Sequence, residues 1–338
     1  MNLEELFCLN AACYDRYKRG AGNIVWHGRK RPRCKCKSCG TTFSYRRGTI
    51  FERLHYPEET VTQVVTLVGY GCPQAAIVKA FGIDERTVSS WMERTGAYAQ
   101  VFHHQQIRAL DLQQVQVDEV RLKLQSLIVW VAMAIAVGSR LWLGAVCQEK
   151  RDKHLAQQIM TCVYNWAQQC ALLITFDGWN AYPNACRKIF RDPQYTGRPG
   201  APKQVPWQQV TLAQIVKHGR GFDGITRWIL QGSCTMFLRL IEKTQSSGTI
   251  NTAYIERLFA TFRGRLALAV RKTRHPARQV DTVSNAIYLV GCLYNFCDHH
   301  RSLGHKRTPA MAAGLTDHQW TVKELFYHRL EPFWASTV

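Results

Sequence analysis

The sequence predicts a mixed α/β protein in which a sheet domain follows a cysteine-rich segment and a helical segment. Cysteine pairs occupy the first 39 residues, two helical patterns separated by a glycine come next, and apolar strand-like runs then alternate with helical patterns. These three observations divide the chain into a cysteine-rich segment at 1–50, a helical segment at 51–102, a linker at 103–113, a sheet domain at 114–316 and a tail at 317–338.

The composition is that of a folded and strongly basic protein. Of 338 residues 46% are hydrophobic, and 44 Lys and Arg against 24 Asp and Glu give a net charge of +20. Such an excess favours a polyanionic partner, above all nucleic acid. The most apolar run, 127–137, is too short to cross a bilayer as a helix, and the first ten residues do not resemble a signal peptide. We therefore expect a cytoplasmic, nucleoid-associated protein with no membrane partner.

Two cysteine pairs near the N-terminus predict a structural zinc site. Cys8 and Cys13 form a C-x4-C pair, and Cys36 and Cys39 form a C-x2-C pair that Gly40 follows. Each pair can present two thiolates to one ion, so that two pairs complete a tetrahedral Zn²⁺ site. The other cysteines are scattered in apolar contexts, which is typical of ordinary thiols in a reduced compartment.

The segment between the cysteine pairs is a short basic hairpin. Its residues Arg29, Lys30 and Arg31 are candidate DNA contacts. His27 and Cys34 remain alternative zinc ligands, although Cys34 lies only two residues from Cys36 and would strain the turn.

Residues 57–102 contain three helical patterns. The first opens at Pro57, the second runs over 73–81 and is followed by a turn at Gly82, and Asp84 is the expected N-cap of the third. A short helix, a glycine turn and a second helix indicate a helix-turn-helix, with an ordinary three-helix packing unit as the alternative. The candidate DNA contacts on the third helix are Arg86, Ser89, Ser90 and Arg94.

The centre of the chain predicts three strands, a crossover helix and a parallel fourth strand. Residues 191–222 are rich in Pro, Gly and basic residues, so we expect an insertion or loop there. The expected strands are 115–117, 127–137, 141–147, 172–176 and 225–231, and the expected helices are 152–170 and 180–190.

Residues 249–274 predict an amphipathic helix with Asn251 as its N-cap and Glu256 beside its apolar stripe. The stripe consists of Ile255, Leu258, Phe259, Phe262, Leu266 and Val270. The alternative for Glu256 is a surface carboxylate paired with a neighbouring arginine. The basic residues of this segment that we consider as DNA contacts are Arg257, Arg263, Arg271 and Lys272.

Asp118 and Asp177 are each expected at the C-terminal end of an apolar strand. If those strands are neighbours, the two carboxylates converge, and Glu256 joins them from the helix packed on the sheet. Three carboxylates around one point require cations, so the pattern predicts a Mg²⁺ or Mn²⁺ site. The alternative is that the aspartates are strand-end turn residues. Glu119 is a rival to Asp118 that is expected to point to the opposite face.

Four segments, VQVDEV, ITFDGWNAY, YIERLFATFRGRL and YNFCDHHRSLGHKRTPA, resemble the motif series of the DDE transposases of bacterial insertion sequences. The cysteine ribbon followed by a helix-turn-helix is most similar to the family founded on insertion sequence one. The resemblance covers residues 8–315 and implies a ribonuclease H-like fold with Asp118, Asp177 and Glu256 as the three catalytic acids. It also implies that His300 and Arg301 contact DNA or pack a helix.

The interval of 79 residues before Glu256 is longer than in many relatives, and the basic insertion accounts for it; Asp223 and Glu242 are the alternative third acids. The resemblance implies metal-dependent DNA cleavage and strand transfer by an enzyme that binds terminal inverted repeats and target DNA as a dimer or higher oligomer. The alternatives are a DNA-binding regulator or domesticated transposase without catalysis, and a ribonuclease H-like nuclease that cuts without joining.

Overall fold

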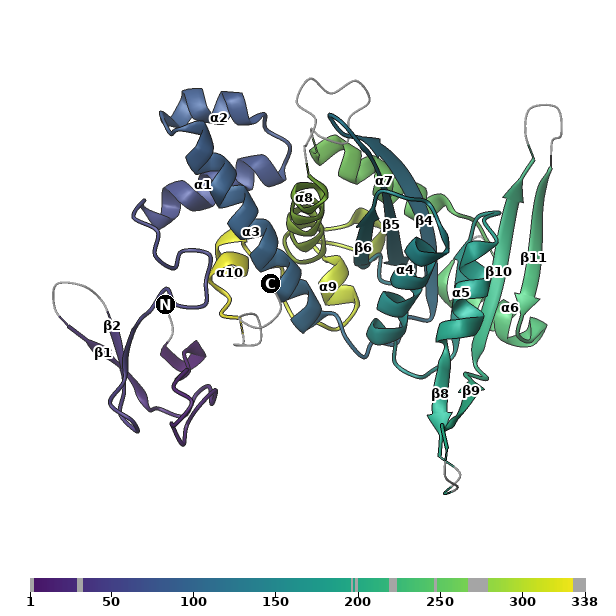
Figure 1. The fold of residues 1–338 in the computed structure, drawn as a ribbon, viewed down its shortest axis with the longest axis horizontal. Helices are drawn as coiled ribbons and strands as arrows, with labels where there is room; N and C mark the ends of the chain where they lie inside the picture. Colours follow the sequence, from purple (N-terminus) through teal and green to yellow (C-terminus); the bar gives the residue numbers. More distant parts are fainter. Residues whose placement is uncertain are drawn as a thin grey trace.

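The computed structural model describes residues 3–28, 33–195, 197, 200–218, 224–245, 248–266 and 279–330. Along the chain a three-stranded sheet comes first, three helices follow, and a six-stranded sheet with helices on both faces makes up most of the remainder (Figure 1). A two-stranded hairpin projects from one end of the larger sheet. The chain is therefore a mixed α/β protein, as the sequence predicts.

The helices and strands have the following bounds. The helices are α1 (Glu58–Gly69), α2 (Gln74–Phe81), α3 (Glu85–Gln106), α4 (Lys153–Trp166), α5 (Ala181–Ile189), α6 (Cys234–Thr244), α7 (Ala253–Arg265), α8 (Val280–Cys292), α9 (Pro309–Ala312) and α10 (Val322–Tyr327). Three short turns of 3-10 or π type are η1 (Leu3–Glu5), η3 (Leu293–Cys297) and η4 (Arg301–Leu303). The strands are β1 (Ile24–His27), β2 (Arg33–Cys36), β3 (Thr42–Ser44), β4 (Gln114–Lys123), β5 (Ile128–Ala136), β6 (Trp142–Gln148), β7 (Leu172–Phe176), β8 (Arg191–Gln194), β9 (Lys203–Pro206), β10 (Val210–Lys217) and β11 (Ile225–Gln231).

The three N-terminal helices form where the sequence predicts them. Pro57 and Pro73 directly precede α1 and α2, where a missing N–H is tolerated. Gly82 ends α2 with a φ of +63°, and the Asp84 side chain caps α3 by accepting a hydrogen bond of 2.9 Å from the Arg86 N–H. α3 continues to Gln106 and therefore includes the first four residues of the segment predicted as a linker, 103–113.

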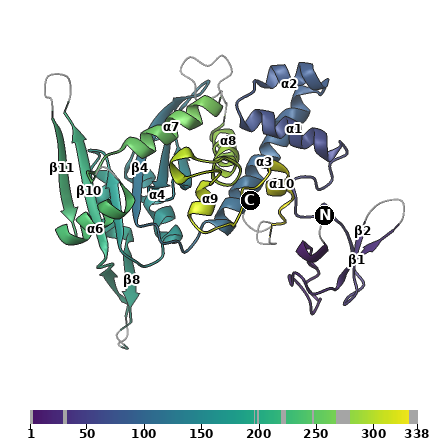
Figure 2. The ribbon, with the colours of Figure 1, turned by 180° about the vertical axis from the view of Figure 1, so that it is seen from behind.

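The six-stranded sheet has the order β11-β10-β7-β4-β5-β6. β4, β5 and β6 are antiparallel neighbours, β7 and β10 run parallel to β4, and β11 returns antiparallel to β10. α4 is the crossover between β6 and β7, so the predicted three strands, helix and parallel fourth strand are confirmed. α4 and α5 pack together over one face, and α6 and α7 cover the other (Figures 1 and 2).

The structure corrects the prediction of a loop over 191–222. The hairpin β8–β9 occupies its first part, and β10 inserts into the sheet beside β7. The first six residues of β10 are all buried, as expected for a strand covered on both faces. The Pro, Gly and basic residues of the hairpin dominate the composition of the segment and conceal this apolar run. The sequence analysis also missed α6, which packs behind β4 and β7.

A second correction concerns β4, which extends to Lys123 and not only to residue 117. Its pairing with β7 stops at Val117, but its pairing with β5 continues through Lys123. Asp118 therefore lies within β4, at the point where the strand loses its parallel neighbour. The strand predicted at 225–231 and the helix around Glu256 are present, although α7 spans only part of 249–274. Residues 267–278, which include Val270, lie outside the described residues.

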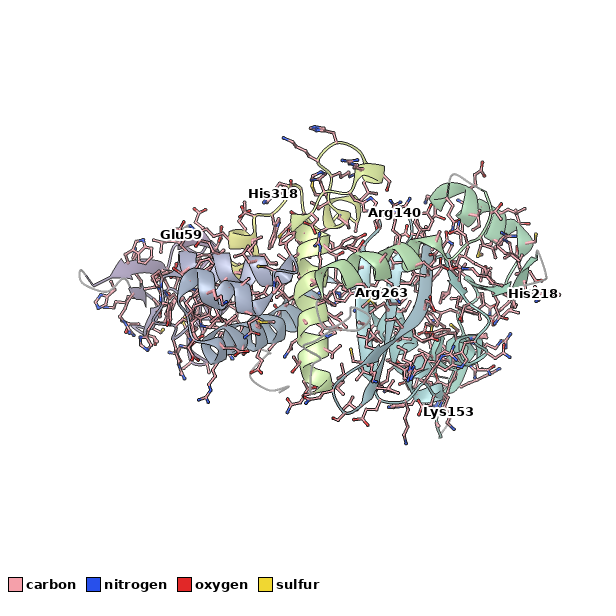
Figure 3. All side chains as sticks on the ribbon, turned by 90° about the horizontal axis from the view of Figure 1, so that it is seen from above. Glu59, Arg140, Lys153, His218, Arg263 and His318 are labelled. Atoms are coloured by element: carbon pink, nitrogen blue, oxygen red, sulfur yellow. The ribbon has the colours of Figure 1, made fainter. Side chains whose placement is uncertain are left out.

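The N-terminal helices share one continuous hydrophobic core with the six-stranded sheet. α8 lies between the two parts and packs along α3 (Figure 3). The two helices approach closely at Gly96, where an added Cβ would lie 2.4 Å from Cβ of Asn285. Only a residue without a side chain fits at this crossing.

The predicted C-terminal tail is a folded part of the protein up to residue 330. Tyr98 OH of α3 donates a hydrogen bond of 2.8 Å to the carbonyl of Leu325 in α10. The rings of Phe51 and Tyr327 lie 4.6 Å apart. The Arg329 side chain is buried and donates a hydrogen bond from Nη2 to the Tyr45 carbonyl at 2.5 Å. The C-terminal segment thus joins the N-terminal sheet and helices to the rest of the chain.

Candidate functional site

Asp118 and Asp177 lie side by side because their strands are parallel neighbours. The last paired residues are Val117 of β4 and Phe176 of β7, and each aspartate comes next in its strand direction. Carboxylate oxygens of Asp118, Asp177 and Glu119 all lie within 4.8 Å of one another. The expected meeting point of the two aspartates is therefore present, with a third acid beside them.

The surroundings of the Asp118 carboxyl disfavour its charged form. Burial above all raises its pKa from 3.8 to about 7; the charges of Glu119, Asp177 and Glu256 act in the same direction, and a hydrogen bond from the Glu119 N–H acts against them. A carboxyl in such surroundings gains from a nearby cation, because the cation offsets both the burial and the repulsion. Three oxygen donors at this spacing suit a hard divalent ion such as Mg²⁺ or Mn²⁺.

Glu119 reaches the cluster from the opposite face of β4, which is the face the alternation of the strand predicts. Its side chain is only 3% exposed. Tyr182 OH donates to Oε2 at 2.6 Å, and Arg151 Nε donates to Oε1 at 2.6 Å. Glu119 therefore has a cationic partner and a hydroxyl donor, whereas Asp118 accepts a backbone hydrogen bond from the Glu119 N–H.

Glu256 lies in the first turn of α7 and, among the described residues, is not part of the group of three carboxylates. Lys217 Nζ and Thr252 Oγ1 both donate hydrogen bonds to its Oε1, the second at 2.7 Å. Burial tends to raise the pKa of Glu256, but the bonds from Lys217 and Thr252 outweigh it and leave the pKa below its usual value. The alternative of an ion pair with a neighbouring arginine is not found among the described residues, where the basic partner of Glu256 is Lys217 of β10.

Gln116 fixes α7 on the sheet, and the sequence analysis did not identify it. Its buried Oε1 accepts hydrogen bonds from the backbone N–H groups of Tyr254 and Ile255 at 3.1 and 3.0 Å, and its Nε2 donates to the Asn251 carbonyl at 2.6 Å. The first N–H groups of a helix have no partner within the helix, so Gln116 satisfies two of them. The alternation of Gln114, Gln116 and Asp118 with valines is the signal that could have identified this polar row.

Asp177 is held by two further contacts. Its Oδ1 accepts a hydrogen bond of 3.0 Å from the Trp179 N–H, and its carbonyl accepts one of 3.0 Å from Gln214 Nε2. Gln214 lies on β10, in the segment that the sequence analysis treated as an insertion. β10 thus supports the site directly.

The candidate DNA contacts on α3 differ in their surroundings. Arg86 and Ser90 are exposed. Ser89 is half-buried, accepts a hydrogen bond of 2.8 Å from Gln74 Nε2 and donates to the Glu85 carbonyl, so it also joins α2 to α3. Arg94 Nη1 donates to the Glu52 carbonyl at 2.6 Å and thereby holds the segment that precedes α1. Arg29, Lys30 and Arg31 lie outside the described residues.

A second basic group lies along α7. Arg257 and Arg263 are exposed on this helix, and Arg271 and Lys272 lie outside the described residues. Arg140, which the sequence analysis missed, stacks its guanidinium 4.1 Å from the ring centre of Tyr254. Figure 3 shows Arg140 and Arg263 near α7.

The segment after α8 contributes to the same basic group. Arg301 is exposed, and His300 is half-buried with Nδ1 2.9 Å from Ser302 Oγ. Burial lowers the pKa of His300, and the charges of Arg140 and Arg257 lower it further. Asn295 has a structural role, because its amide pairs with both the N–H and the carbonyl of Trp142 at the edge strand β6.

The four predicted zinc ligands converge in the N-terminal sheet. One Sγ of each of Cys8, Cys13, Cys36 and Cys39 lies within 4.8 Å of the others, and two of the Sγ pairs are 3.6 and 3.7 Å apart. Tetrahedral bonds of about 2.3 Å to Zn²⁺ require sulfurs about 3.8 Å apart, so the group fits this ion. Among the described residues, neither His27 nor Cys34 belongs to the group.

Hydrogen bonds prepare this cysteine group for a metal. Burial raises the pKa of Cys8 to about 12, whereas hydrogen bonding with the side chain and backbone of Thr41 lowers the pKa of Cys39 to about 6. Gly40 follows with a φ of +72° and donates its N–H to the Cys36 carbonyl at 2.8 Å. Cys39 is therefore the thiol most ready to lose its proton to an arriving cation. Cys34 faces the same small core but lies near Arg329 instead.

No family model matches the chain, and no curated protein matches it. Among solved structures, the chain aligns with a chain of the simian T-cell lymphotropic virus intasome, solved by cryo-electron microscopy in complex with the PP2A regulatory subunit B56 gamma. The alignment has 12% identity, covers 80% of this chain and 76% of the other, and has a TM-score of 0.29. A TM-score this low carries no argument about fold or function. None of the helices in the described part of the chain is long and apolar enough to span a membrane.

Proposed function

We propose that the chain is a DDE-type DNA transposase with a ribonuclease H-like catalytic domain, a zinc ribbon and a helix-turn-helix. The observation that carries this proposal is the convergence of Asp118 and Asp177 at adjacent parallel strands, with Glu256 presented by a helix that Gln116 anchors to the same strand. The sequence motifs around these three residues and the net charge of +20 support it.

Asp118, Asp177 and Glu256 would hold Mg²⁺ or Mn²⁺, and Cys8, Cys13, Cys36 and Cys39 would hold the structural Zn²⁺. A divalent ion at the acids supplies stabilisation of the charge that develops on phosphodiester oxygens during cleavage and strand transfer. The protein supplies the rest: Gln116 orients α7, Gln214 and the Trp179 N–H orient Asp177, and the charge pair of Arg151 and Glu119 fixes the opposite face.

DNA would be bound along the basic surface. We assign the terminal inverted repeats to the exposed face of α3 at Arg86 and Ser90 and to the basic hairpin of the ribbon. Arg257, Arg263, His300 and Arg301 would hold the phosphate backbone near the cleavage point. Because two element ends are processed together, a dimer or higher oligomer on DNA is the expected active form.

A strand-transfer assay tests this proposal. Purified protein is incubated with duplexes that carry the DNA sequence flanking the gene, a target plasmid and Mg²⁺, and cut and joined products are measured separately. We expect both products from the parent chain, and neither from Asp118→Asn or Asp177→Asn. Cut product without joined product would identify a nuclease, and DNA binding without either product would identify a regulator.

A further inference from the structure

A lysine side chain forms an ion pair with Glu256, one of the carboxylates that the proposed function assigns to the metal site. Lys217, the last residue of β10, donates from Nζ to Glu256 Oε1. The same oxygen accepts the bond from Thr252. Asp118 and Asp177 form their close group without Glu256. The ion pair therefore holds Glu256 toward β10 and away from the two aspartates.

The sheet brings Lys217 to this position. The pairing of β10 with β7 stops at Gln214 opposite Phe176, so that Lys217 extends beyond the strand end where Asp177 lies. The hydrogen bond from Gln214 to the Asp177 carbonyl fixes the start of this extension. The side chains of Lys217 and Glu256 are 55% and 49% exposed, so the pair is open to water, ions and an approaching phosphate.

We propose, on the basis of the proposed function, that Lys217 is a latch on the third acid: its ammonium pairs with Glu256 in the protein without DNA and moves to a DNA phosphate when substrate binds, which releases Glu256 to join Asp118 and Asp177 around the metal. Exposed ion pairs are weak, which suits a contact that must open. A phosphate oxygen competes for the same ammonium, and the contact gains from counterion release.

This arrangement links the binding of metal to the binding of DNA. Lys217 cannot pair fully with Glu256 and with a phosphate at the same time, so each ligand removes an obstacle to the other. The free protein therefore has a low affinity for the divalent ion, and the site is completed only where DNA is present. Such a device limits cleavage to bound substrate.

Binding of Mn²⁺ to the full chain, followed by electron paramagnetic resonance, tests the latch without any measurement of activity. Three substitutions are compared with the parent chain: Lys217→Met removes the charge, Lys217→Arg keeps it, and Lys203→Met removes an exposed lysine from β9 as a matched control. We expect Lys217→Met to bind Mn²⁺ about two- to five-fold more tightly than the parent chain, since an exposed ion pair of ordinary strength no longer competes. Lys217→Arg and Lys203→Met should bind as the parent does.

Two further measurements are specific to the proposed mechanism. The difference between parent and Lys217→Met should shrink at high salt, because salt screens an exposed ion pair. Addition of a duplex with the DNA sequence flanking the gene should raise the Mn²⁺ affinity of the parent by a larger factor than that of Lys217→Met. Equal enhancement in both proteins would overturn the latch.

Asp177→Asn separates a failure of the latch from a failure of the proposed function. If the parent binds Mn²⁺, Asp177→Asn does not, and Lys217→Met binds as the parent does, the latch is wrong and the proposed function stands. If Asp177→Asn leaves Mn²⁺ binding unchanged, whether or not Lys217 is also replaced, the latch and the proposed function are both overturned.

Discussion

The side-chain oxygen of Gln116 accepts a hydrogen bond of 3.0 Å from the backbone N–H of Ile255, which joins β4 to the first turn of α7. Gln116 lies two residues before Asp118, and Ile255 lies next to Glu256. One buried amide thus sets the position of the helix that carries the third acid relative to the strand that carries the first. This relationship has direct consequences for the effect of substitutions.

Gln116→Ala should leave two helix N–H groups and the Asn251 carbonyl without their partner and should lower the free energy of unfolding by about 1–3 kcal/mol. Strand cleavage at saturating DNA should fall more than DNA affinity, because the helix carrying Glu256 is displaced. Gln116→Glu keeps the acceptor and should retain more activity than Gln116→Ala. Denaturant unfolding and cleavage kinetics measure the two effects, with Gln204→Ala on the exposed β9 as control. Unchanged kinetics in Gln116→Ala would show that Gln116 does not position Glu256.

The raised pKa of Asp118 predicts that the free energy of unfolding depends on pH when a chelator keeps the protein free of metal. With a pKa of about 7 when folded against 3.8, the native state binds a proton that the unfolded state releases, so the free energy of unfolding should fall as pH rises from about 4 to 7. Asp118→Asn removes this loss and should be more stable than the parent by about 1–3 kcal/mol at pH 8, and equal to it near pH 4. Thermal melts across this range test the sign; a variant less stable than the parent at pH 8 would refute it. Added Mg²⁺ should stabilise the parent and not the variant.

Much of this site could be predicted from the sequence because its parts obey local rules. Val-Gln-Val-Asp and Ile-Thr-Phe-Asp are short apolar runs that end in an acid, and the stripe from Ile255 to Leu266 has a clear helical period, with all its described members buried. For the same reason the cysteine spacing predicts the four cysteines that converge.

The remainder depends on contacts between distant segments. No local pattern indicates that β10 inserts beside β7, that Gln116 caps α7, or that Lys217 meets Glu256, since each contact joins residues far apart in the chain. β10 is also preceded by a hairpin whose polar composition favours a loop. Tertiary pairing decides such cases, not local propensity.

Gly96→Val should disturb the crossing of α3 and α8. An added Cβ would lie 2.4 Å from Cβ and 2.7 Å from Cα of Asn285, so the helices must separate, with an expected destabilisation of about 1–3 kcal/mol or more. Gly264→Ala on α7 is the matched control, because no atom lies within 4 Å of its added Cβ and helix propensity favours alanine. Denaturant unfolding should show a lower midpoint for the first variant only. Equal midpoints would mean that the crossing tolerates a side chain.

Zinc content distinguishes Cys36 from Cys34, which lie two residues apart on β2 and are both buried. Cys36→Ser should reduce bound zinc in the full chain from about one equivalent to well under half, because a structural site needs its four thiolates. Cys34→Ser should retain the full equivalent, since Cys34 is outside the converging group. Metal analysis of the dialysed proteins measures both; loss of zinc in Cys34→Ser would return Cys34 to the set of ligands.

The packing of α3 against α8 has a consequence for folding during synthesis on the ribosome. α3 ends at Gln106, but α8, which covers it, begins only at Val280. At a synthesis rate of about 5–20 residues per second, α8 is made on the order of ten to forty seconds after α3. During that interval the apolar flank of α3 is exposed on the nascent chain. A chain interrupted before α8 would therefore leave α3 without its packing partner, and such a fragment should be a substrate for chaperones and proteases.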